Sequence, residues 1–199
     1  MRTFCIVLPE TAALTAKAKA HFHSVGLDGL EYFDGIHAQR AGLSTINVCE
    51  IDHPGNGWRM GFKPTGIYLS HFMLWAVLDY QPDSHFLVLE SDAKFSVDWK
   101  SRMEQALRDV PTDFDLLYIG SCCCQDLPKS KVKGEVWRVC PLCTHAYIVA
   151  KKALPVLRQE LRRIYAPVDI AMQLHAAPKL NVYTVLPRIV DQFDTTIIP

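Results

Sequence analysis

Two acidic side chains stand one residue apart, directly after an apolar run. Glu90 and Asp92 flank Ser91 and follow the segment 85–89, His-Phe-Leu-Val-Leu. Side chains two positions apart in an extended chain point the same way, so both carboxylates can address one centre. Hard divalent cations such as Mn²⁺ and Mg²⁺ prefer carboxylate oxygens and often bind through one or two carboxylates plus substrate phosphates. The pair is what a metal–diphosphate site needs, but taken alone the motif favours a surface turn with two solvated acids.

Short apolar runs and amphipathic stretches alternate along the chain and predict the elements that position these acids. Apolar runs that indicate strands fall at 4–8, 30–36, 85–89, 114–119, 143–150 and 180–186. Stretches that indicate helices fall at 10–25, 66–80, 98–110, 151–164 and 168–174. Because strands and helices alternate, we expect an α/β fold with a mostly parallel sheet. Ligands of such sheets bind outside the carboxyl ends of the strands, which is where the acidic pair falls.

The helix expected at 66–80 carries one apolar stripe with helical spacing. Its members are Leu69, Phe72, Met73, Ala76 and Tyr80. The stretch 37–65 before it holds several glycines and prolines and little periodicity. A segment of that length without regular structure is typical of a functional loop or of disorder.

The composition describes one domain with a single core, residues 1–199. Hydrophobic residues make up 49% of the 199 positions and charged residues 21%. Lys and Arg total 21, as do Asp and Glu, so the net charge of zero gives no electrostatic basis for binding nucleic acid. No apolar run approaches the roughly 20 residues that cross a bilayer, and the short N-terminal run does not resemble a signal peptide. We therefore expect a soluble, cytoplasmic protein.

Motifs in a fixed order give the acidic pair a context. A helical segment with Ser70, His71 and Trp75 precedes the strand that ends in Glu90-Ser91-Asp92-Ala93. Other matching segments are 5–10, 113–120, 143–149, 167–169 and 187–192. Over most of its length the chain thus resembles glycosyltransferase family 25, which includes lipooligosaccharide and collagen galactosyltransferases. It departs from the family at Ser91, where the family has Asp, and at 10–13, where arginines usually follow the opening Leu-Pro.

The resemblance implies a GT-A type, Rossmann-like domain and a metal-dependent glycosyltransferase. Such an enzyme moves a hexose, with galactose favoured, from a UDP-sugar to a glycan or protein hydroxyl with inversion. The resemblance makes Asp92 the primary ligand of Mn²⁺ or Mg²⁺, and Glu90 a second ligand, a water-mediated ligand or a ribose contact. His145 is a candidate for a further metal ligand, with a hydrogen-bonded strand histidine as the alternative.

The same resemblance proposes donor-binding residues. Leu8 and Pro9 end the opening strand, Ser70 and His71 lie ahead of the acidic motif, and Gln192 comes late in the chain, before 194–196. Each has a structural alternative. Ser70 could bond back to a carbonyl of its own helix, His71 could bridge helix and sheet, and Gln192 could belong to a surface tail.

An inverting transferase also needs a general base for the acceptor hydroxyl. Asp169, near a helix start, is our candidate, and a helix cap is the alternative role for it. Trp75 is expected in the core rather than in a stacking platform. Because the chain is short for a self-sufficient glycosyltransferase, a homo-oligomer or a partner could complete the acceptor side.

Five of the seven cysteines crowd into positions 122–143. Cys122, Cys124, Cys140 and Cys143 have a spacing compatible with a Cys₄ zinc site, but free packed thiols are the favoured interpretation, and one disulfide is a further alternative. Zinc would favour an adaptor with an inactive glycosyltransferase-like body. A nucleotidyltransferase that uses the same acidic pair is a further alternative.

Overall fold

The computed structural model describes residues 1–8, 12–42, 46–48, 58–122, 124, 127–164 and 166–193. Within these residues the centre of the molecule is an eight-stranded sheet with the order β2-β1-β5-β10-β7-β11-β9-β8. The strands, in that order, are Glu31–Asp34, Arg2–Val7, His85–Glu90, Leu142–Ala150, Leu116–Cys122, Val182–Val185, Val136–Arg138 and Ser130–Lys133.

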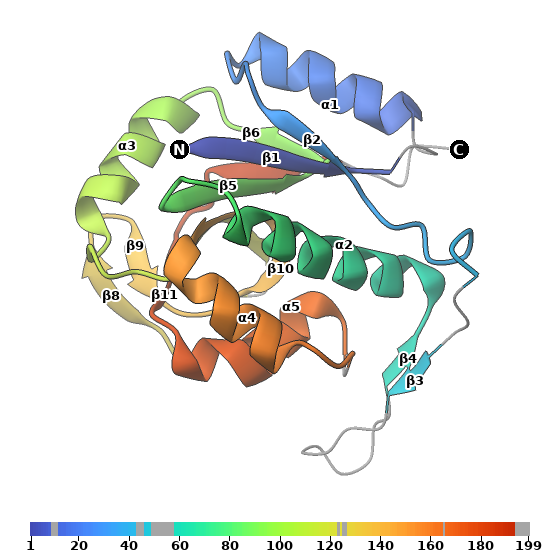
Figure 1. Ribbon diagram of the computed structural model, residues 1–199. Helices are drawn as coiled ribbons and strands as arrows, with labels where there is room; N and C mark the ends of the chain where they lie inside the picture. The colour runs from blue at the N-terminus through green and yellow to red at the C-terminus, as the bar shows by residue number, and fades with distance from the viewer. Residues whose placement is uncertain are drawn as a thin grey trace.

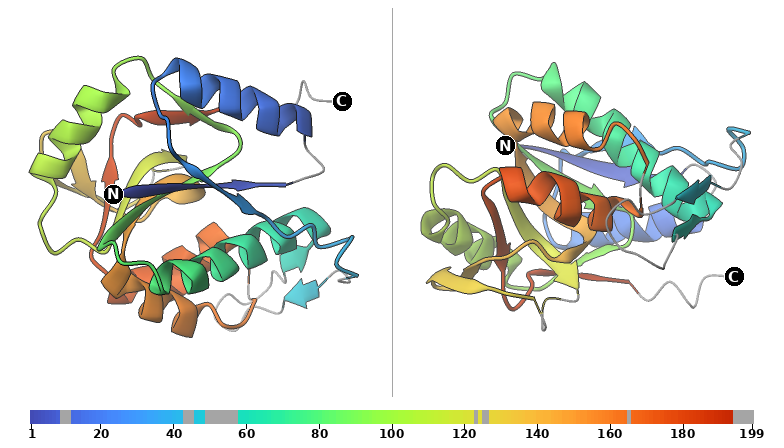
Figure 2. Two further views of the ribbon diagram at one scale, coloured as in Figure 1. Left: turned by 45° about the horizontal axis from the view of Figure 1, so that its top comes forward. Right: turned by 90° about the horizontal axis from the view of Figure 1, so that it is seen from below.

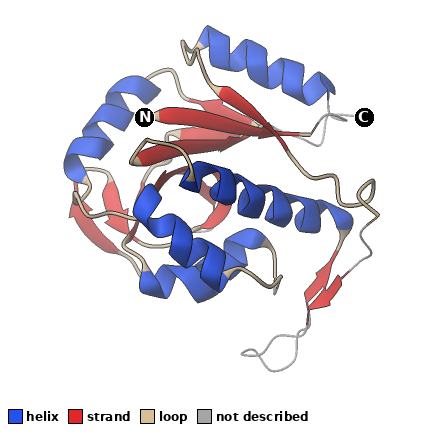
Figure 3. Cartoon of the chain, viewed as in Figure 1, coloured by secondary structure: helices blue, strands red, loops and turns tan. Residues whose placement is uncertain are grey.

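Most strands of this sheet run in one direction. β10 and β9 are antiparallel to both of their neighbours, so the other six strands share a direction. The predicted α/β fold with a mostly parallel sheet is confirmed. Two small sheets accompany it: β6 (Ala93–Phe95) pairs with β12 (Val190–Gln192), and β3 (Ile46–Val48) pairs with β4 (Trp58–Met60) near the start of α2 (Figure 3).

Helices cover both faces of the large sheet (Figure 1). α2 (Phe62–Asp79), α4 (Leu154–Glu160) and α5 (Val168–Ala171) lie on one face, where α2 and α4 run side by side (Figure 2). Short 3₁₀ and π segments, Lys151–Ala153, Met172–Ala176 and Ala177–Lys179, adjoin α4 and α5. α1 (Ala12–Ser24) and α3 (Trp99–Asp109) lie on the other face. None of the described helices is long and apolar enough to cross a membrane.

The sequence of β5 explains why both faces are covered. Successive strand residues point to opposite faces, so Phe86 and Val88 pack into the core under α2, whereas Leu87 and Leu89 pack into the core under α1 and α3. All four are at most 2% exposed. By the same alternation Glu90, the next residue, belongs to the α2 side. The strand therefore delivers its terminal carboxylate beneath that helix.

The buried face of α2 differs from the predicted stripe. Leu74 and Trp75 are fully buried, whereas Met73 and Tyr80 are 48% and 87% exposed. The stripe prediction was wrong because apolar residues occur nearly all round this helix, so spacing alone did not select the face. The helix also begins at Phe62, four residues before the predicted start. The prediction that Trp75 lies in the core is confirmed.

Candidate active site

A cavity of about 480 Å³ opens at the carboxyl ends of β1 and β5. Leu8 follows β1, Glu90 ends β5, and Ser91 and Asp92 form the turn after it. The chain after β2, residues 36–39, the first turns of α2 and Leu14 of α1 form the remaining walls. The acidic pair thus lies at the edge of the sheet where the sequence pattern predicted a ligand.

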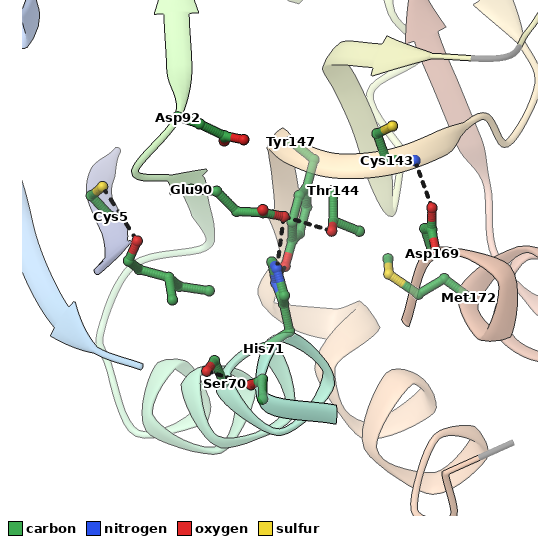
Figure 4. A network of polar contacts seen from close by, with 12 residues as sticks. Cys5, Ser70, His71, Glu90, Asp92, Cys143, Thr144, Tyr147, Asp169 and Met172 are labelled. Carbon is green, nitrogen blue, oxygen red and sulfur yellow. Dashed lines mark hydrogen bonds and ion pairs between the residues drawn. The ribbon is translucent and has the colours of Figure 1, made fainter. Parts of the chain in front are cut away.

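Glu90 is held in place by two donors (Figure 4). Its Oε1 accepts hydrogen bonds from Thr144 Oγ1 at 2.7 Å and from His71 Nε2 at 3.2 Å. Burial opposes ionisation of this carboxyl, but the hydrogen bonds from His71 and Thr144 outweigh it, so its pKa lies below the ordinary value. The side chain remains 20% exposed, toward the cavity that it lines. Glu90 is therefore a fixed, ionised carboxylate at the cavity wall.

Asp92 has one bound and one free oxygen. Its Oδ2 accepts a hydrogen bond from Gln192 Nε2 at 2.9 Å, whereas Oδ1 is buried and has no hydrogen-bond partner among the described residues. Burial and the neighbouring charge of Glu90 raise the pKa of Asp92 to about 6. A buried carboxylate oxygen without a partner is unfavourable, and a cation or a donor from a ligand would satisfy it. The donor chemistry at Asp92 therefore fits a hard divalent ion.

His145 does not join the two carboxylates as a third ligand. It is 1% exposed, its Nε2 lies 3.2 Å from the carbonyl oxygen of Val190, and burial lowers its pKa. In the described part of the chain no group of three or more His, Cys, Asp or Glu side chains is arranged to hold a metal ion. The contact of Nε2 with Val190 fits the alternative of a hydrogen-bonded strand histidine, whereas Nδ1 is buried and has no partner among the described residues. A cation here would have to complete its coordination with substrate oxygens or water.

The predicted donor residues divide between the cavity wall and its support. Ser70 Oγ donates to Gly66 O at 2.6 Å and accepts from the Ile36 amide at 2.8 Å, so it ties α2 to the loop after β2 while it lines the cavity. Both ring nitrogens of His71 are occupied by protein groups, which makes it the bridge from helix to sheet. Gln192 contacts the site through Asp92. Pro9 and the segment 194–196 lie outside the described residues.

Asp169 is not among the residues that line the cavity. Its Oδ2 accepts the Cys143 amide at 3.0 Å and its Oδ1 accepts the Ile170 amide at 2.9 Å. Figure 4 shows its carboxylate turned toward Cys143. The N-cap of α5 is Pro167, so Asp169 belongs to the first turn, where it satisfies free backbone amides. Its role as a general base stays a prediction.

The cysteine cluster forms a disulfide. Cys122 at the end of β7 is bonded to Cys143 at the start of β10, whereas Cys124 and Cys140 are free thiols. The alternative of a four-cysteine zinc site is wrong, because two of its four ligands are bonded to each other, and the favoured free thiols hold for Cys124 and Cys140 alone. The alternative of one disulfide is the one observed.

Three side chains at the site carried no assigned role in the sequence analysis. Thr144 and Tyr147 belong to the segment 143–149 that resembles the family, so the sequence pointed to them without assigning them a function. Lys63, in the first turn of α2, lines the cavity and lies close enough to Asp92 to influence its charge. It lies in the stretch that the sequence pattern left without regular structure, so no spacing pointed to it.

The arrangement can be compared with known proteins. No protein-family model and no curated protein matches the chain in sequence. A crystal structure of a glycosyltransferase involved in glycosylation of the major capsid of PBCV-1 matches with a TM-score of 0.55 and 10% identity, over 97% of this chain and 94% of that one. The galactosyltransferase LgtC, solved with donor and acceptor sugar analogs, matches with a TM-score of 0.52 and 11% identity, over 97% and 87%.

Identities this low establish the fold alone. The chain has the α/β fold of GT-A glycosyltransferases, with a mostly parallel sheet flanked by helices. Membership of glycosyltransferase family 25 stays a prediction.

Proposed function

We propose that the protein is a metal-dependent glycosyltransferase that transfers a hexose from a UDP-sugar to an acceptor hydroxyl with inversion. The observation that carries the proposal is Asp92 Oδ1, a buried carboxylate oxygen with no partner among the described residues, on a side chain that lines a cavity at the carboxyl edge of a GT-A sheet. The preference for galactose and the acceptor class, a glycan or a protein hydroxyl, rest on the family resemblance.

The two carboxylates have different duties in this proposal. Asp92 would offer Oδ1 to Mn²⁺ or Mg²⁺, while Gln192 holds its other oxygen. Glu90, fixed by His71 and Thr144, adds negative charge beside it. A divalent ion bound there would neutralise the diphosphate of the donor as a Lewis acid.

The rest of the cavity suits the remainder of a nucleotide donor. Lys63 is the one lysine or arginine among the described residues that line it, so it is our candidate contact for the diphosphate. Ile6, Leu14 and Ile67 give the wall an apolar part that can cover a nucleobase or ribose. This lysine would supply the positive charge that arginines supply in the family pattern.

Asp169 remains the proposed general base for the acceptor. Each of its oxygens accepts one backbone amide and keeps a further lone pair, which leaves capacity to accept a proton. Because Asp169 does not line the cavity, an acceptor hydroxyl would have to reach it from outside the cavity. A homo-oligomer that completes this side also stays a prediction.

The test is the binding of UDP by isothermal titration, with and without Mn²⁺, to the wild type, Asp92→Asn and Asp98→Asn. We expect Mn²⁺ to lower the Kd of the wild type for UDP. In Asp92→Asn this Mn²⁺-dependent decrease in Kd should be at least tenfold smaller. Asp98→Asn, which neutralises an exposed acid outside the cavity, should keep it. An Asp92→Asn protein that retains the full Mn²⁺-dependent affinity would contradict the proposal. With UDP-sugars, release of pyrophosphate instead of UDP would favour the nucleotidyltransferase alternative.

A further inference from the structure

A buried chain of hydrogen bonds runs from Trp75 on α2 to Tyr147 on β10, returns to His71 on α2 and ends at Glu90 on β5; Figure 4 shows the last three of these residues. Trp75 Nε1 lies 2.9 Å from Tyr147 Oη, which lies 3.0 Å from His71 Nδ1, and His71 Nε2 lies 3.2 Å from Glu90 Oε1. The three aromatic side chains are at most 1% exposed. We propose that Tyr147 is a positioning residue, which fixes the proton of His71 on Nε2 and thereby holds Glu90 at the cavity.

The direction of each bond follows from what its atoms can do. An indole N–H only donates, so Tyr147 Oη accepts from Trp75. The hydroxyl proton of Tyr147 then needs an acceptor, and among the described residues His71 Nδ1 is the ring nitrogen within reach. His71 Nδ1 therefore carries no proton, and the ring proton lies on Nε2, where it is donated to Glu90.

The opposite tautomer would leave two groups unsatisfied. If His71 carried its proton on Nδ1, the buried hydroxyl proton of Tyr147 would have no acceptor. The bare lone pair of Nε2 would also face the carboxylate of Glu90. Both arrangements are unfavourable where water is excluded.

This order has a consequence for the carboxylate. Oε1 of Glu90 receives donors from both His71 and Thr144, whereas none of the described residues donates to Oε2. The chain of hydrogen bonds therefore occupies Oε1 of Glu90 and leaves Oε2 for a ligand in the cavity. Outer partners of this kind orient the groups that contact a ligand, and their loss commonly weakens metal binding 10- to 100-fold. The functional part of the inference rests on the proposed function, whereas the tautomer does not.

The tautomer can be measured without a ligand. Two-bond ¹H–¹⁵N spectra of protein labelled with ¹⁵N-histidine distinguish protonated from bare ring nitrogens, and His71→Gln identifies the signals of His71. We expect wild-type His71 to carry its proton on Nε2. A proton on Nδ1 in the wild type would overturn the inference, whatever the variants do.

Tyr147→Phe removes the donor to Nδ1, and Tyr118→Phe is its matched control. Tyr118 is equally buried, its ring lies 5.8 Å from that of Tyr147, and its hydroxyl contacts Met172 Sδ instead of His71. We expect Tyr147→Phe to populate the Nδ1–H form and to weaken Mn²⁺-dependent UDP binding at least tenfold. Tyr118→Phe should change neither.

Equal losses of UDP affinity in the two variants would refute the positioning role, because they would reflect packing alone. A wild type that binds no UDP with Mn²⁺ would refute the proposed function. The tautomer of His71 in Tyr147→Phe would still decide whether Tyr147 sets it. An unchanged tautomer in that variant would refute the inference.

Discussion

Gly66 allows the loop after β2 to pass against α2. A Cβ atom at this position would lie 2.4 Å from the carbonyl oxygen of Ile36 and 3.4 Å from the amide nitrogen of Ala38. Contacts below 3.0 Å are essentially never seen for real Cβ atoms, and ordinary ones begin near 3.4 Å. Gly66→Ala must therefore separate the helix from the loop backbone by about 1 Å, the difference between 2.4 Å and an ordinary contact of 3.4 Å.

The expected change in stability is the difference of two terms. Overpacking in a filled interior costs about 1–3 kcal/mol, and the upper part of that range applies because the atom met at Ile36 belongs to the backbone. Alanine in a helix interior returns about 1 kcal/mol relative to glycine. We expect Gly66→Ala to lower the free energy of unfolding by about 2 kcal/mol. Because Ile36 and Ala38 line the cavity, UDP affinity should fall as well.

Urea unfolding and UDP titration measure the two effects. Gly61→Ala is the control, since it lies at the N-cap of the same helix, has an ordinary φ of −78°, and would place its Cβ 3.9 Å from Pro64 Cδ. It should lose less than about 1 kcal/mol. A Gly66→Ala protein as stable as the wild type, with unchanged UDP affinity, would show that Ile36 does not approach α2 as described.

Two further perturbations address the disulfide and the pH dependence of stability. The bond between Cys122 and Cys143 closes a loop of sequence separation 21, for which chain entropy predicts about 3 kcal/mol of stability. Reductant should therefore lower the urea midpoint of the wild type but not that of Cys122→Ser, and equal responses would contradict the bond. Partial burial and the nearby Lys94 lower the pKa of His21 below 6.5, so the unfolded chain takes up a proton first and stability falls as the pH drops below about 6.5. His21→Gln should flatten part of this fall in unfolding experiments between pH 7 and 5, and an unchanged slope would exclude His21 as a source.

The central strands were predictable because they are buried on both faces. The segment predicted at 85–89 became β5, His85–Glu90, because a continuous apolar run is typical of a strand that is buried on both faces. The hairpin of β8 and β9 was not predicted, because all four residues of β8 are exposed and Val132 is the one apolar side chain among them. The reversed direction of β10 was not predictable either, since an apolar run has the same composition in both directions.

The location of the site was predictable, but its inner connections were not. Strand ends place Leu8, Glu90 and Asp92 at one edge, and the sequence shows where those strands end. That Tyr147 contacts His71 depends on which face of α2 meets β10, and the predicted stripe selected another face of that helix. The pairing of the cysteines was not predictable for a related reason. Cysteine spacing shows that thiols can meet, whereas the pairing of β7 with β10 decides which two do.

The two carboxylates of the site also explain why a cation suits it. Hydrogen bonds from His71 and Thr144 keep Glu90 ionised despite its burial, so its charge acts on Asp92 across a medium with little water. Asp92 receives one stabilising donor, from Gln192, and its second oxygen has none among the described residues. The unfavourable energy of the pair is thus concentrated on Oδ1 of Asp92, a residue that lines the cavity. A divalent ion at that oxygen would relieve both the repulsion and the missing contact, whereas a neutral protein donor would relieve only the missing contact.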